Sequence, residues 1–135
     1  MQSLLAPFLA LSLLAGPASA EGGEHVPMVG RDGPEADACG GIGRVSGLYD
    51  PDGKAFLSVR EEHDDYAREK DKLPAGTLVW LCDAADDWQG IVYATGEFQD
   101  LGDCRVSGKV AAPEPYSGPC SYGWVLARNL QLVGQ

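Results

Sequence analysis

Residues 77–93, TLVWLCDAADDWQGIVY, carry the strongest strand signal in this chain of 135 residues. Residues 77–82 and 88–93 are short runs rich in β-branched and aromatic residues, and an acidic turn separates them. Strand side chains alternate between two faces, so Val79 and Leu81 share one face, and the opposite face is also apolar. We therefore expect a hairpin with both faces covered.

Other strand-like segments flank this hairpin. They are GIGRV within 40–45, FLSVR at 56–60, YGWV at 122–125 and RNLQL at 128–132, and the turn DPDG at 50–53 precedes the second of them. Short strands separated by turns predict an all-β fold. The expected core consists of Leu57, Val59, Leu73, Val79, Leu81, Trp88, Val92, Trp124, Val125 and Leu130.

The spacing of these segments resembles one family. The order LSVR, then Tyr66, Leu73-Pro-Ala-Gly76, Trp88 and finally Gly123-Trp-Val125 is similar to that of bacterial SH3-like (SH3b) domains. The resemblance implies a small SH3-like barrel over residues 39–135, with Tyr66 packing back on the barrel from a charged loop. It also implies a binding role rather than catalysis, although the fold alone does not decide function.

Residues 94–121 depart from the family pattern, which has a short hairpin at this point. The segment contains Cys104 and Cys120, and it is too long for a simple turn. We expect a disulfide-braced loop insertion with a hairpin of its own, and residues 113–116 look like its exposed tip.

The four cysteines are expected to form two disulfides. They are Cys39, Cys82, Cys104 and Cys120, and no Cys-x-x-Cys or Cys-x-x-His pair suggests zinc. We favour Cys39–Cys82 with Cys104–Cys120, because the segment at Cys39 would then cover the face of Trp80. The alternative, in which the insertion covers Trp80 and Cys82 joins Cys104 or Cys120, stays open because spacing does not fix connectivity.

The N-terminal residues indicate export. Residues 1–20 have an apolar run and end in Ala-Ser-Ala, which is typical of a signal peptide, and the run is short for a membrane anchor. Residues 21–38 are rich in Gly, Pro and acids and read as a flexible arm. We expect a periplasmic or secreted protein.

The net charge of −10 restricts the partners. An acidic surface repels nucleic acid and attracts a basic protein. No metal or cofactor is predicted, and an EF-hand spacing is absent. We expect no enzyme activity, because no Gly-x-Ser-x-Gly motif is present, the paired carboxylates are adjacent in charged loops, and His63 reads as a surface residue.

Aromatic residues carry the binding hypothesis. Tyr66, Trp80, Tyr93 and Tyr116 are the candidate surface aromatics for a peptide or peptidoglycan. Arg60 is expected to bond a carboxylate or backbone carbonyl at a barrel corner, and recognition of a ligand carboxylate is its alternative role. The main hypothesis is a non-catalytic binding module. The alternative is a periplasmic inhibitor or immunity protein that plugs a basic hydrolase with the loop between the last two cysteines.

Overall fold

The computed structural model describes residues 24–95 and 101–135, so the expected signal peptide lies outside the described residues. The elements are β1 Met28–Val29, β2 Gly41–Val45, β3 Phe56–Arg60, β4 Glu69–Pro74, β5 Leu78–Ala85, β6 Trp88–Tyr93, β7 Glu114–Pro115, β8 Ser121–Leu126, the 3-10 turn η1 Ala127–Asn129, and β9 Leu130–Gly134. The all-β prediction is confirmed. Within the described ranges, no helix has the length and apolar character needed to span a bilayer.

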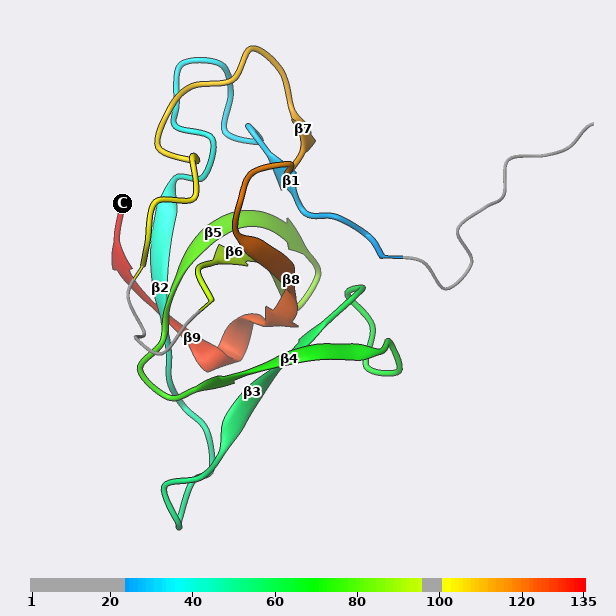
Figure 1. Cartoon of the computed structure of the whole chain (residues 1–135), viewed down its shortest axis with the longest axis vertical. Coiled ribbons are helices and arrows are strands. Elements are labelled where there is room, and N and C mark those ends of the chain that lie inside the picture. Colours follow the sequence, from blue (N-terminus) through cyan, green and yellow to red (C-terminus); the bar gives the residue numbers. More distant parts are fainter. Residues whose placement is uncertain (1–23, 96–100) are drawn as a thin grey trace, which may run out of the picture.

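Seven of the strands form one antiparallel sheet in the order β4-β3-β8-β6-β5-β2-β9, and β1 pairs separately with β7. The sheet bends strongly (Figure 1). Its two edge strands, β4 and β9, do not pair with each other in the described residues. A closed barrel is therefore not confirmed.

The two edge strands differ in chemistry. β4 has the sequence EKDKLP, with four charges and a proline, whereas β9 has the sequence LQLVG and no charge. Leu132 and Val133 of β9 are 56% and 39% exposed. We expected residues 61–72 to be a charged loop, but the second part is β4. An edge strand accommodates alternating charges because one side of it faces water.

β3 shows the clearest match between pattern and structure. Leu57 and Val59 point inward and are buried, while Phe56, Ser58 and Arg60 point outward. The inward residues belong to an inner cluster inside the bent sheet. Its buried members are Val45, Leu57, Val59, Leu73, Val79, Ile91, Tyr93 and Val125, and Leu81 and Leu130 pack against them.

Three residues of the expected core lie elsewhere. Val92 faces away from the inner cluster, Trp124 is buried on the outer face of β8, and Trp88 is partly exposed. Ile91 and Tyr93 fill the inner cluster instead. Because both faces of β6 are apolar, alternation alone could not identify the inward one.

A second layer, the outer cluster, covers the opposite face of β5, β6 and β8. Its buried members are Val29, Ala38, Cys39, Cys82, Val92, Cys104, Val106 and Tyr116, with Trp80 and Tyr122 packed against them. The disulfides are Cys39–Cys82 and Cys104–Cys120, so the favoured pairing is confirmed. The N-terminal segment and the insertion together cover Trp80, whose indole N–H donates to Gly102 O (3.3 Å).

Residues 24–38 form a packed strap, which differs from the expected flexible arm. Tyr116 N donates to Pro27 O (2.9 Å), and Ala38 N donates to Gly108 O (2.7 Å). The short β1–β7 pair adds to these bonds. The strap forms turns of its own, with Gly30 N donating to Ala38 O (2.8 Å), and it is held to the insertion by the bonds above. Turns and contacts distant in sequence leave no local sequence period. The insertion forms no hairpin of its own among its described residues, and residues 96–100 lie outside them.

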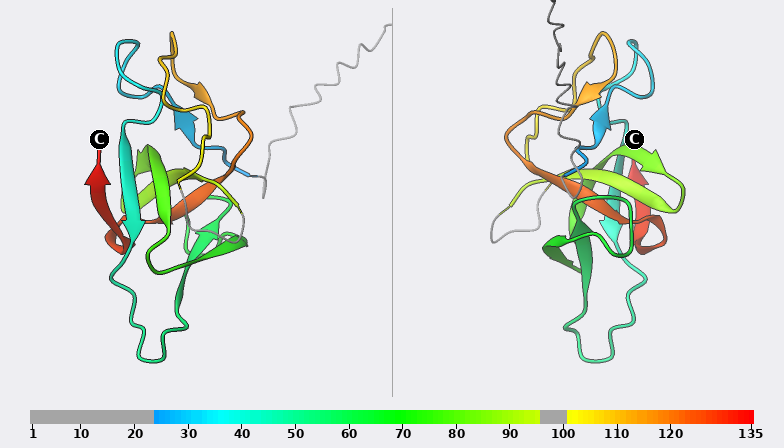
Figure 2. Two further views of the ribbon diagram at one scale, coloured as in Figure 1. Left: turned by 60° about the vertical axis from the view of Figure 1, so that its left-hand side comes forward. Right: turned by 90° about the vertical axis from the view of Figure 1, so that its right-hand side faces the viewer.

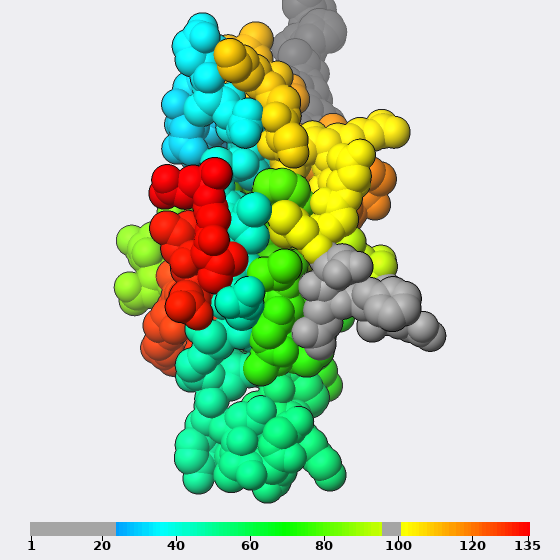
Figure 3. All heavy atoms as spheres, turned by 90° about the vertical axis from the view of Figure 1, so that its left-hand side faces the viewer, coloured from blue at the N-terminus to red at the C-terminus, as the bar shows by residue number. Residues whose placement is uncertain are grey.

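The molecule has two distinct ends. The strap and the insertion project together at one end, and the loop between β2 and β3 extends at the other (Figure 2). β9 lies alongside β2 on the face seen in Figure 3. The central sheet thus carries a lobe at one end and an exposed loop at the other.

Candidate ligand-binding groove

The five predicted site residues do not form one surface. Tyr66 is 95% exposed and does not pack on the sheet, whereas Tyr93 and Tyr116 are 1% and 6% exposed. Trp80 is partly covered by the insertion. Only Arg60 lines a hollow together with a tryptophan. The expectation of an exposed aromatic surface is therefore wrong for the two buried tyrosines.

The buried tyrosines have structural roles. The Tyr93 hydroxyl donates to Asp71 Oδ2 (3.0 Å), and burial, followed by the charge of this carboxylate, raises the pKa of Tyr93. The Tyr116 hydroxyl donates to Cys104 O (3.0 Å) and accepts from Cys120 N (2.9 Å). Each ring fills a cluster while its hydroxyl meets a polar partner, which is how a buried tyrosine avoids a desolvation cost.

The hollow that includes Arg60 is a groove of about 210 Å³. Its lining comes from the loop before β3, from β3 itself and the loop after it, from the first residue of β6, from the end of β8 and from η1. The lining residues are Leu48, Phe56, Leu57, Ser58, Arg60, Asp65, Trp88, Leu126 and Asn129. The groove therefore combines apolar and aromatic side chains with one cation and one carboxylate, as small binding sites commonly do.

Trp88 is positioned by the turn before it. Asp86 adopts a positive φ of 54°, which is tolerated by an aspartate in a tight turn. The turn starts β6 at Trp88, which pairs with Ala85 on one side and Leu126 on the other. The indole is partly buried, and its N–H has no hydrogen-bond partner among the described residues. It is therefore available to a ligand.

Arg60 anchors the loop at the groove. Its Nη1 donates to Ala67 O (2.8 Å), the backbone-carbonyl role expected from the sequence. The loop holds itself through Ala67 N to Asp64 O (3.1 Å) and Tyr66 N to Asp64 Oδ1 (2.9 Å). Arg60 thus fixes the loop whose residue Asp65 lines the groove. The other N–H groups of Arg60 have no hydrogen-bond partner among the described residues.

A second hollow of about 310 Å³ adjoins the groove, because Leu126 lines both. It is bordered by Asp86, Asp87 and Arg128. The two hollows, together called the track, are lined by apolar side chains, three carboxylates and two arginines. Such a surface favours a ligand with an apolar side chain and charged groups of both signs.

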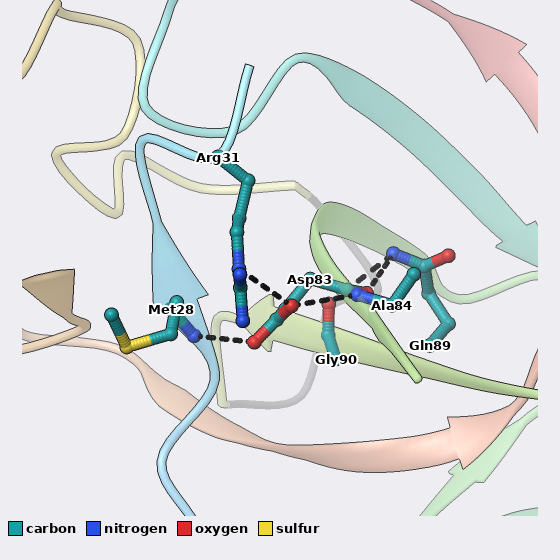
Figure 4. Close-up of polar contacts among 6 residues, drawn as sticks. All are labelled: Met28, Arg31, Asp83, Ala84, Gln89 and Gly90. Carbon is teal, nitrogen blue, oxygen red and sulfur yellow. Dashed lines mark hydrogen bonds and ion pairs between the residues drawn. The ribbon is translucent and has the colours of Figure 1, made fainter. Parts of the chain in front are cut away.

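Another hollow lies elsewhere and has a structural explanation. About 370 Å³ in volume, it is lined by Arg31, Asp32, Gly40, Gly41, Leu81, Cys82, Asp83, Ala84, Gln89 and Gln135. Asp83 is buried and accepts hydrogen bonds from Met28 N (2.9 Å) and Arg31 Nε (3.1 Å) (Figure 4). Because its carboxylate is already occupied by the strap, we interpret this site as a clamp rather than a ligand site.

Sequence reasoning missed most of the groove. Trp88 was assigned to the core, and Phe56 and Asp65 were not considered as site residues. One signal was present: a tryptophan directly after a tight acidic turn starts a strand at the sheet margin, where one side of the ring is reachable. Within the described residues, no group of three or more His, Cys, Asp or Glu side chains is placed to hold a metal ion.

No protein-family model, no curated protein and no solved structure matches this chain. The functional interpretation therefore depends on the geometry of the groove and on the sequence pattern.

Proposed function

We propose that this chain is an exported, non-catalytic binding module of SH3-like plan that holds an extended peptide in the groove beside Trp88. The observation that carries the proposal is the partly exposed indole, whose N–H has no partner among the described residues and which lines one groove with Phe56, Arg60 and Asp65. Aromatic grooves of this kind hold extended peptides through stacking and a few polar contacts. The two disulfides fit an oxidising compartment.

The charges of the track favour a peptide with both an amine and a carboxylate. Asp65, Asp86 and Asp87 would attract the amine, and the remaining N–H groups of Arg60 would donate to the carboxylate. Peptides of the bacterial cell wall carry both groups, so peptidoglycan is the first ligand class to test.

The test combines retention and spectroscopy. Purified peptidoglycan should retain the protein at low salt, and a soluble disaccharide-tetrapeptide fragment should shift the indole N–H resonance of Trp88. Trp88→Ala removes this reporter and should abolish the retention. Tyr49→Ala is the matched control, because Tyr49 is 89% exposed and lies outside the groove lining. Absence of retention, or equal retention of the Trp88 variant, would reject the proposal.

One observation favours the alternative of an inhibitor. The loop between Cys104 and Cys120 is braced inside by the Tyr116 hydroxyl and projects with the strap at one end of the molecule (Figure 2). A braced loop loses little conformational entropy on binding. Because Tyr116 belongs to the outer cluster, deleting the loop would disturb the fold, so a surface substitution is the better test.

Glu114 lies exposed on this loop. If the loop plugs a basic hydrolase, Glu114→Lys should weaken inhibition of a basic lysozyme and Trp88→Ala should not. If Trp88→Ala weakens inhibition and Glu114→Lys does not, or if the original protein does not inhibit at all, the groove remains the functional site.

A further inference from the structure

Both histidines of the chain meet at one place. His25 comes from the strap and His63 from the loop after β3, and their ring centroids are 5.1 Å apart. Each ring also packs on the buried indole of Trp124, with centroid distances of 5.5 Å and 4.9 Å. Only two histidines exist in 135 residues, and the fold brings residues 38 positions apart into contact.

The backbone holds this pair in place. His25 N donates to Glu61 O (2.9 Å), and the Trp124 indole N–H donates to His25 O (2.7 Å). His25 is thereby fixed to the base of the loop that carries His63. A preset arrangement of donor side chains lowers the cost of ordering them when a ligand binds.

The spacing of the rings fits one shared ion. If two imidazole nitrogens bind an ion at about 2.0–2.1 Å and subtend about 90–110°, the ring centroids lie about 4.5–5.2 Å apart. The observed 5.1 Å is within this range. The loop around His63 is acidic on balance, because Glu62, Asp64 and Asp65 remain after Glu61 pairs with Arg68 (3.4 Å), in a chain of net charge −10. This raises the local concentration of cations.

We propose that His25 and His63 form a two-histidine site for a late first-row divalent metal ion, with Cu²⁺ bound most tightly. Imidazole suits Cu²⁺, Ni²⁺ and Zn²⁺, and affinity for such ligands peaks at Cu²⁺. Because the described residues place no third ligand at the pair, the remaining coordination positions are open to water or to a donor from a partner. The ion would tie the strap to the loop. This site is separate from the groove.

The experiment titrates the full chain with CuCl₂ near pH 7.5, where free imidazole is mostly neutral as metal binding requires. Tryptophan fluorescence reports binding because Trp124 lies directly against both rings. We expect quenching that saturates at one equivalent, weaker binding of Zn²⁺ and no response to Mg²⁺.

His25→Phe and His63→Phe are the decisive variants, because phenylalanine keeps an aromatic ring on Trp124 and removes the nitrogen ligand. Each should weaken Cu²⁺ binding by about tenfold or more, since even outer partners of metal ligands contribute about 10–100-fold. Circular dichroism checks that both variants fold. Unchanged affinity in a folded variant, or no saturable quenching of the original protein, would show that the rings only pack.

A copper-dependent rise in thermal stability gives a second measurement. An ion that binds the strap and the loop together stabilises the folded state by mass action. The rise should occur in the original protein and vanish in both phenylalanine variants. A rise of equal size in the variants would assign it to another site and overturn the proposal.

Discussion

Replacing Asp83 tests whether one buried carboxylate holds the strap on the sheet. Its side chain is 3% exposed and accepts hydrogen bonds from Met28 N, Arg31 Nε and Ala84 N, at 2.9, 3.1 and 2.8 Å (Figure 4). Asp83→Ala removes all three bonds at once. We expect the strap to loosen while the inner cluster stays intact.

The size of the effect follows from these contacts. The partly buried amide of Met28 would lose its acceptor, and a buried unsatisfied donor costs about 1–3 kcal/mol. Ala84 is exposed, so its amide regains water and adds little. The Arg31 side chain is 55% exposed and is solvated by water when the carboxylate is removed, so the loss of its ion pair adds little. We expect the free energy of unfolding to fall by about 1–3 kcal/mol, a sizeable share of the roughly 5–15 kcal/mol typical of a domain.

Urea denaturation with intact disulfides measures this change. The midpoint should fall by about 0.5–1.5 M, given an m value of about 2 kcal/mol/M. The midpoint of Asp83→Asn should lie between those of the original protein and Asp83→Ala, because the asparagine amide oxygen accepts a hydrogen bond but carries no charge. Asp52→Ala, in an exposed turn, is the control and should change stability by less than about 0.5 kcal/mol.

Hydrogen exchange locates the change. In Asp83→Ala, the amides of Met28 and Tyr116 should exchange faster, since the first loses its acceptor and the second bonds to strap residue Pro27. A loss below about 1 kcal/mol with unchanged strap protection would refute the clamp, because a buried donor would then have lost its acceptor without cost.

Three further changes test other contacts. Tyr116→Phe should lower the unfolding free energy by about 1–3 kcal/mol in urea, because two buried backbone groups lose the hydroxyl. Gly123→Ala should cost about 1–3 kcal/mol by thermal melting, since the added methyl would lie 2.3 Å from Val59 Cγ1. Hydrogen bonds from Lys70 and then Tyr122 hold the pKa of Glu24 below its ordinary 4.5, so their contribution is present above pH 4.5 and disappears as pH falls through the lowered value. Glu24→Gln should therefore differ from the original protein by less than about 1 kcal/mol at neutral pH in urea titrations, and the difference should close below pH 4.5.

Local sequence pattern predicted the strands well where one face meets water. In β3, apolar and polar residues alternate, and Leu57 and Val59 were assigned inward correctly. The pattern failed in β6, where Val92 and Ile91 are both buried but in different layers. Two covered faces give no polar residue to mark the outside, so the inward face depends on contacts distant in sequence.

Composition predicted the two disulfides, but it did not predict that the strap packs in a fixed conformation. Its Gly, Pro and acidic residues resemble a flexible segment, yet Val29 and Ala38 are buried against the insertion. The partners lie more than 65 positions further along the chain, at Val106 and Tyr116. The groove was missed for a related reason. A tryptophan in a strand is usually a core residue, and the partial exposure of Trp88 depends on the positions of β3 and of the loop after it, which are distant in sequence.

The contrast between β4 and β9 limits how this sheet can grow. The charges and proline of β4 oppose strand addition there, whereas the uncharged backbone edge of β9 is open to it. A sheet with one edge open to pairing can accept one more strand there, but it cannot add strands at both edges and so cannot grow into a continuous sheet of many copies. If two copies join through β9, each uses its only such edge, and assembly ends at a pair instead of continuing into a fibre.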